Sequence, residues 1–199
     1  MNDREIAVVR EHLVASAELT RQVAERSASD VARAAVLIAD VLQRGGKMML
    51  CGNGGSAADC QHVAAECVSR LTKEFERPGI PAVALTTDTS FLTAYANDVE
   101  FDGVFARQVA TLGHRGDVLV GISTSGESAN IVRAAEEART RGMAIVALCA
   151  ERGRLGDMAD VAIRVPGTSV QHIQESHLAI EHALVALIER RLYPREREP

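Results

Sequence analysis

The sequence has 199 residues, of which 47% are hydrophobic and 25% are charged, and its formal net charge at pH 7 is -5. This length is enough for one sizeable hydrophobic core, and the composition excludes a disordered chain. The negative balance, with four Phe, two Tyr and no Trp, argues against a nucleic-acid-binding protein, because such proteins use a basic surface or stacked aromatic rings.

The apolar residues are spread along the chain rather than gathered in one long run. No run of about 18 apolar residues is present, so we expect no transmembrane helix and no membrane partner. Charges of both signs near the N-terminus are unlike a secretory signal peptide, and we expect a cytoplasmic protein. In a reducing compartment, cysteines without metal-binding spacing are usually buried thiols. We expect this of all four cysteines, Cys51, Cys60, Cys67 and Cys149.

Two helices are predicted before any strand. In residues 3–26 the apolar side chains, among them Ile6, Val9 and Leu13, recur every three or four positions, as on one face of a helix. The same spacing predicts a second helix over 29–43, which two glycines then end.

Strands and helices alternate through the rest of the chain. Short apolar runs separated by helical segments indicate parallel strands joined by crossovers and covered on both faces. We therefore predict a three-layer αβα sandwich with a parallel sheet of about five strands and an N-terminal helical extension. The expected strands are 47–51, 81–85, 117–122, 143–149 and 160–165, and the expected helices are 57–70, 88–97, 101–112, 129–141 and 170–192. A single domain over 1–199 would comprise helices in 1–44, an α/β core in 45–192 and a charged tail in 193–199.

A glycine-rich turn follows the first predicted strand. Ligands of open parallel sheets bind beyond the carboxyl ends of the strands. In Gly52-Asn53-Gly54-Gly55-Ser56 the missing Cβ atoms let backbone amides approach an anion at the start of a helix. The turn also matches the dinucleotide pattern G-x-G-x-x-A. A dinucleotide site also needs an acidic residue at the end of the next strand, but Glu74 and Glu76 come before that strand. The dinucleotide interpretation is therefore weaker than an anion site. A tight turn that binds no ligand is the third interpretation.

A second turn is rich in hydroxyl groups. It reads Ser123-Thr124-Ser125-Gly126-Glu127-Ser128 and follows the third predicted strand. Hydroxyls and free amides can surround a phosphate, although serines here could also serve as helix N-caps. Two anion-binding turns on one sheet, without a cofactor motif, predict a small phosphorylated substrate.

Histidines and carboxylates recur at helical spacing. His62 and Glu66 are four residues apart and share a helix face, where they could bind zinc or simply stabilise the helix. In the last helix His177 and Glu181 form another such pair, so spacing alone does not decide which histidine is functional.

Five blocks of the sequence together resemble the sugar isomerase (SIS) domain family. They are GNGGSAADCQH-x3-E-x3-R at 52–70, RPGIPAVALTTDTS at 77–90, AND at 96–98, STSGES at 123–128 and IQESH-x4-H at 173–182. The resemblance covers essentially the whole chain and implies a SIS fold of the flavodoxin-like type.

The resemblance also implies an activity. This is an aldose–ketose isomerase that converts D-sedoheptulose 7-phosphate to D-glycero-D-manno-heptose 7-phosphate through an enediol(ate), the first step of bacterial ADP/GDP-heptose biosynthesis. Such a reaction needs a base at C1 and an acid at C2. Glu66 is the candidate base and His182 the candidate acid.

Carried over position by position, the family pattern implies ligands and partners. One zinc ion per subunit would be held by His62, Glu66, Gln174 and His182. The sugar would contact Asn53, Gly54, Gly55, Ser56, Glu66, Arg70, Asn97, Asp98 and Gln174, and the phosphate would contact Ser123, Thr124, Ser125 and Ser128. The family further implies a homotetramer with active sites near subunit interfaces.

Two positions depart from the family pattern. Glu127 stands in the phosphate turn where members often have Lys, and Thr168-Ser169-Val170 replaces a stretch that commonly carries an Asp. The alternative function is a non-catalytic SIS-fold binding protein of the type that associates with the replication initiator. Because such proteins lack the catalytic pair, Glu66 and His182 favour the enzyme.

Overall fold

A five-stranded parallel sheet forms the centre of the protein, whose computed structural model describes residues 2–194. The strands are β1 (Met48–Gly52), β2 (Ala82–Ala84), β3 (Val118–Ser123), β4 (Ala144–Ala150) and β5 (Val161–Val165). Their order is β2-β1-β3-β4-β5, and every neighbouring pair is parallel. The predicted fold class is confirmed. All residues of β1 and β3 are buried, as expected for strands covered on both faces.

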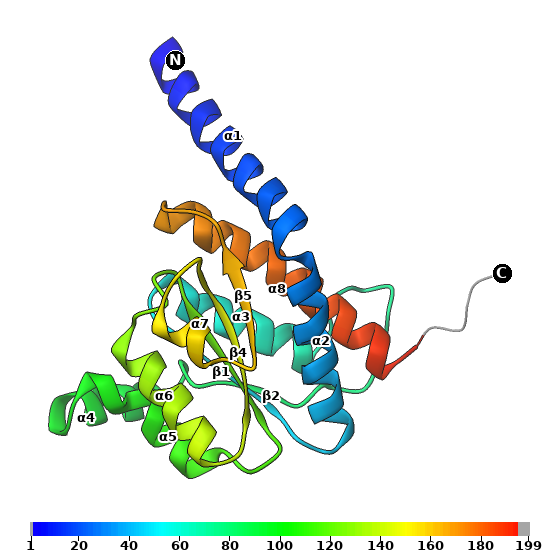
Figure 1. Ribbon diagram of the computed structural model, residues 1–199, viewed down its shortest axis with the longest axis vertical. Helices are drawn as coiled ribbons and strands as arrows, with labels where there is room; N and C mark the ends of the chain where they lie inside the picture. The colour runs from blue at the N-terminus through cyan, green and yellow to red at the C-terminus, as the bar shows by residue number, and fades with distance from the viewer. Residues whose placement is uncertain (1, 195–199) are drawn as a thin grey trace.

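Helices cover both faces of this sheet (Figure 1). Because successive side chains of a strand point to opposite faces, Met48 and Leu50 pack with one set of helices and Met49 and Cys51 with the other. The first set is α2 (Ala28–Gln43), α3 (Gly55–Val68) and α8 (Val170–Leu192), and the second is α5 (Val104–Leu112), α6 (Ala129–Thr140) and α7 (Arg154–Met158).

Two further helices extend from this body. Helix α1 (Asp3–Arg26) begins with a capping box and buries Leu19 and Val23 near its C-terminal end, while its N-terminal half projects outward (Figure 1). Helix α4 (Thr89–Asp98) has no buried residue and packs mainly against α5 and the short 3-10 helix η1 (Phe101–Gly103).

Most predicted boundaries differ from the observed ones by one or two residues. Helices α1 and α8 begin and end where predicted. Helix α3 was expected over 57–70, but it starts in the glycine turn and ends at Val68, because the chain turns away at Ser69. The expected helix 101–112 is η1 followed by α5, and α7 was not predicted. Of the expected tail 193–199, residues 195–199 lie outside the described part.

Among residues 2–194, no helix combines the length and the apolar character needed to cross a membrane.

Candidate active site

The two predicted anion-binding turns lie side by side. Strands β1 and β3 are neighbours in register, with Gly52 opposite Ile122. From β1 the chain continues into α3 on one face of the sheet, and from β3 it continues into α6 on the other. Two neighbouring strands whose chains leave toward opposite faces of the sheet form a topological switch point, and open α/β sheets bind ligands there.

The glycine turn depends on its missing side chains. Gly54 precedes α3 with φ +56°, in the left-handed region that L side chains avoid. A Cβ on Gly55 would overlap the side-chain amide of Gln174. Helix α3 therefore starts with Gln174 packed directly against its backbone, and its first amides are available to an anion.

Two asparagines connect this turn to the serine turn. The side-chain amide of Asn53 donates to Asn130 Oδ1 at 2.8 Å, and that of Asn130 donates back to Asn53 Oδ1 at 2.9 Å. Asn130 is buried in the first turn of α6. It was not among the expected site residues, although its place two residues after the serine turn was a usable signal.

In the second turn the serine hydroxyls gather around one another. Ser123 Oγ lies 3.0 Å from Ser128 Oγ and 3.4 Å from Ser125 Oγ. The backbone amide of Gly126 donates to Ser123 Oγ at 3.1 Å. Ser128 is the N-cap residue of α6, but its side chain makes no capping hydrogen bond. Capping therefore does not account for this hydroxyl, which stays within the turn beside half-buried Thr124.

His62, Glu66 and His182 form a compact cluster between α3 and α8. Glu66 Oε1 lies 3.2 Å from His62 Nε2 and 3.5 Å from His182 Nε2, and the two imidazole nitrogens are 3.0 Å apart. The histidine side chains are about half exposed, whereas that of Glu66 is 13% exposed. Because His182 joins it from α8, the pair on α3 is more than a local helix-stabilising contact.

This cluster has the composition of a zinc site. One ligand atom from each of the three residues lies within 4.8 Å of the others. The second carboxylate oxygen of Glu66 is buried without a hydrogen-bond partner among the described residues. Two imidazoles and a carboxylate with an open position suit Zn²⁺.

Gln174 lies at the glycine turn, where it packs against Gly55 and reaches Asp59, one helical turn before His62. Helix α8 is regular from Val170 onward, so Gln174 is not in an irregular first turn. Its side-chain amide donates to Asp59 Oδ2 at 3.4 Å. Burial raises the pKa of Asp59, while this hydrogen bond and nearby His62 lower it. Sequence reasoning missed Asp59, which lies one turn before His62 on α3.

Burial distinguishes the histidines of α8. His177 is fully buried, and burial lowers its pKa to about 4, which leaves a neutral ring inaccessible to substrate. His182 is open to solvent beside Glu66. Glu181 is buried next to it, and burial, with the nearby charges of Asp59 and Glu66, raises the pKa of Glu181 to about 8.

Comparison with known proteins gives the family. The model of the SIS domain matches residues 11–150. The chain belongs to the SIS domain family. Its similar relatives include the phosphoheptose isomerase of Chlorobaculum tepidum, 48% identical over 92% of this chain and 88% of that protein. The phosphoheptose isomerase of Burkholderia pseudomallei is 43% identical over 98% of this chain and 100% of that protein.

Solved structures of SIS proteins agree with this assignment. A phosphoheptose isomerase from Francisella tularensis superposes with a TM-score of 0.89, at 35% identity over 96% of this chain and 100% of that one. The phosphoheptose isomerase of Neisseria gonorrhoeae gives a TM-score of 0.86, at 42% identity over 92% of this chain and 97% of that one.

The departures from the SIS pattern have local structural roles. Glu127 Oε1 accepts a hydrogen bond from the backbone amide of Arg154 at 3.0 Å, so this carboxylate is drawn toward the first turn of α7. Ser169 is the N-cap of α8 and accepts from the amide of His172 at 3.5 Å.

Three predicted sugar-binding residues lie apart from the cluster. Arg70 was expected one turn further along α3, but the helix ends before it and the residue is exposed. Asn97 and Asp98 are exposed at the end of α4, where the amide of Asn97 donates to Asp98 at 2.8 Å.

The remaining expectations concern the cysteines and the dinucleotide alternative. All four cysteines are buried free thiols, as predicted, and burial raises the pKa of Cys51 and Cys67 to about 12. Strand β2 ends at Ala84, and the first acidic residue beyond it, Asp88, caps α4 through the amide of Phe91. Asp88, which would have to bind the ribose of a dinucleotide, therefore caps a helix instead.

Proposed function

We propose that this SIS protein is an aldose–ketose isomerase that converts D-sedoheptulose 7-phosphate to D-glycero-D-manno-heptose 7-phosphate, the first step of bacterial ADP/GDP-heptose biosynthesis. One observation carries the proposal: Glu66 and His182 meet between α3, which begins in the glycine turn, and α8, whose Gln174 packs against that turn. The phosphoheptose isomerases of Chlorobaculum tepidum and Burkholderia pseudomallei match 92% and 98% of this chain, which supports the same conclusion. The four free thiols fit a reducing compartment, and we place the reaction in the cytoplasm.

The substrate is held by the two turns. The phosphate binds at the serine turn, where hydroxyl groups and the first backbone amides of α6 donate hydrogen bonds and no cation is needed. The sugar takes the glycine turn and the adjoining α3 face. The phosphate contacts are Ser123, Thr124, Ser125 and Ser128, and the sugar contacts are Asn53, Gly54, Gly55, Ser56, Arg70, Gln174 and, from a neighbouring subunit, Asn97 and Asp98.

Proton transfer is assigned to Glu66 and His182. Glu66 takes the proton from C1 of the ketose, and His182 delivers a proton to C2, while the hydroxyl proton of O1 moves to O2. The 3.5 Å between Glu66 Oε1 and His182 Nε2 puts both groups within reach of adjacent carbon atoms.

A zinc ion fits the same residues. His62, Glu66 and His182 already converge, and the orphaned oxygen of Glu66 gives a further reason to expect a cation. Gln174, which contacts Asp59 one turn before His62, would complete the ligand set. When bound, zinc supplies a Lewis acid that polarises the carbonyl group and stabilises developing negative charge.

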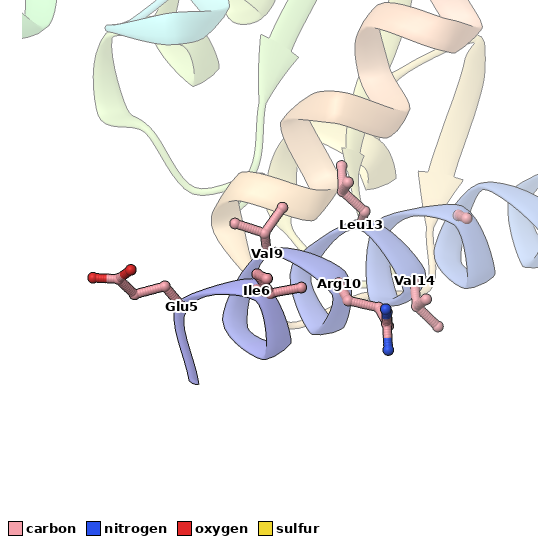
Figure 2. Close-up of a pocket in the computed structure, with 7 residues that line it drawn as sticks. Glu5, Ile6, Val9, Arg10, Leu13 and Val14 are labelled. Carbon is pink, nitrogen blue, oxygen red and sulfur yellow. The ribbon is translucent and has the colours of Figure 1, made fainter. Parts of the chain in front are cut away.

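The oligomer that we propose is a homotetramer built through α1. Ile6, Val9 and Leu13 form an exposed apolar stripe along this helix (Figure 2), and Leu13 is 62% exposed. The partner we propose for this stripe is a second copy of the chain. Asn97 and Asp98, the expected sugar-binding residues of α4, would then contact the sugar bound by that second copy. Light scattering should give four times the 21.3 kDa of one chain, and a mass near 21.3 kDa would contradict the tetramer.

The activity is tested with the purified chain and sedoheptulose 7-phosphate. The parent protein should produce the aldose, and Glu66→Gln should lower kcat by about 1000-fold or more, because the base is lost. Its urea denaturation midpoint should stay close to that of the parent, since the partners of Glu66 in the described part of the chain are two half-exposed histidines rather than a buried lysine or arginine. Glu74→Gln makes the same change at an exposed residue and should retain full activity. Absence of turnover across several ketose phosphates, with and without added Zn²⁺, would contradict the proposal.

A further inference from the structure

A second cluster of two histidines and a carboxylate lies outside the active site. His12 from the middle of α1 meets His172 and Glu175 from the first two turns of α8. His12 Nε2 is 2.8 Å from Glu175 Oε1, and His12 Nδ1 is 3.2 Å from His172 Nε2. The two imidazole rings pack edge to face, with centroids 4.6 Å apart.

The separations of the donor atoms suit one metal ion. One ligand atom from each residue lies within 4.8 Å of the others. Donors on a tetrahedral ion with bonds of about 2.1 Å are about 3.4 Å apart, close to the 3.2 Å between the two imidazoles.

This cluster is separate from the active site although both use α8. His172 and Glu175 are three residues apart and share the helix face that meets α1. Gln174, between them in sequence, points to Asp59 and Gly55 on α3. An ion at the second cluster would therefore not share ligands with the first.

We propose that His12, His172 and Glu175 form a second binding site for a divalent transition-metal ion, for which Zn²⁺ is the preferred occupant. The side chains of His12 and Glu175 are 42% and 41% exposed, so the ion reaches the site from solvent. Two imidazoles and one carboxylate leave a coordination position for water.

The site would fasten the projecting part of α1 to the body. The buried residues of α1 are Leu19 and Val23, and His12 lies about two helical turns before Leu19. A metal bridge at His12 therefore extends the anchor toward the free end of the helix. The apolar stripe that begins with Ile6 and includes Val9 (Figure 2) would then be held at a fixed angle.

Zinc counting tests this site directly. The full-length chain is stripped with a chelator, dialysed against Zn²⁺ and measured for zinc per chain, alongside His12→Gln, His62→Gln and His114→Gln. His114 is an exposed histidine outside both clusters, so its replacement is the matched control. We expect His12→Gln to bind one zinc ion fewer than the parent, with at least a 10-fold weaker residual affinity, and His114→Gln to match the parent.

The His62→Gln arm separates the two sites. Loss of one ion in this variant, and of a different ion in His12→Gln, supports two independent sites. Co²⁺ spectra add a second readout, because a tetrahedral site gives visible absorption bands that His12→Gln and Glu175→Gln should both reduce. Equal zinc content and equal affinity in the parent and His12→Gln would overturn the proposal, whatever His62→Gln shows.

Discussion

Two regions of the α3–α8 pair differ in how their buried polar groups are paired: the far end around Arg77 and Glu189, and the stretch of α8 from Ser176 to His182. The helices run in the same direction, with Gln174 beside the start of α3 and Glu189 beside its end. At the far end Arg77 donates to Glu189 Oε1 at 2.6 Å, and also to the carbonyl oxygens of Glu66 and Cys67, each at 2.8 Å. The Arg77 and Glu189 side chains are 1% and 5% exposed, so this end contains a buried ion pair.

The Ser176–His182 stretch of α8, with the Glu66 carboxylate that it faces, leaves polar atoms unpaired. Buried oxygens of Glu66, Ser176 and Glu181 have no hydrogen-bond partner within the part of the chain that the structure describes. Buried polar groups are normally satisfied, and exceptions tend to mark sites that bind a ligand or an ion. The comparison teaches that Arg77 and Glu189 hold the two helices together, whereas the unpaired polar groups near His182 mark a place where a ligand or an ion binds.

The largest test of this difference replaces Arg77. Arg77→Met leaves Glu189 buried without its cation and the last carbonyl groups of α3 without donors, so we expect a loss of about 3–5 kcal/mol in the free energy of unfolding. Urea denaturation measures it. Arg33→Met, which breaks the exposed pair with Asp30, is the matched control and should cost less than about 1 kcal/mol.

Replacing both partners sharpens the result. Because much of the loss comes from the unpaired carboxylate, Arg77→Met with Glu189→Met should recover part of the stability that Arg77→Met loses. If Arg77→Met is as stable as the Arg33→Met control, the ion pair does not hold the two helices together.

Sequence patterns predicted the elements because their signals are local. Buried strands such as β3 and β4 are short apolar runs, and α8 shows a continuous helical period. The end of α3 was misplaced because Arg77, which binds its last carbonyl groups, is remote from Val68 in sequence. Helix α7 has five residues, too few for a periodic pattern to emerge.

Site residues in the turns that follow strands could be predicted from the local sequence. Site residues whose role depends on contacts between distant elements could not. The turns at Gly54 and Ser125 were found from their own residues. Spacing alone left His177 and His182 open, and the resemblance to the SIS family chose His182; in the folded chain His177 is buried whereas His182 is open to solvent. Asn130 and Asp59 were missed because their roles depend on partners in other elements, Asn53 and Gln174.

A test with a smaller expected effect concerns His177, the buried histidine of the Ser176–His182 stretch. Its pKa is about 4 in the folded protein and about 6.5 in an unfolded chain. As the pH falls, the unfolded chain gains this proton first, so the contribution to stability is complete above pH 6.5 and is lost as the pH falls toward 4. The shift corresponds to about 3 kcal/mol at most.

His177→Gln should remove this pH dependence, whatever its effect at neutral pH. The measured quantity is the difference between the free energies of unfolding at pH 7 and pH 4.5, from urea denaturation of the metal-free protein. His114→Gln makes the same chemical change at an exposed site and should keep the slope of the parent. An unchanged slope in His177→Gln would mean that the Ser176–His182 stretch accommodates a buried charge, and it would remove the contrast with the Arg77 end.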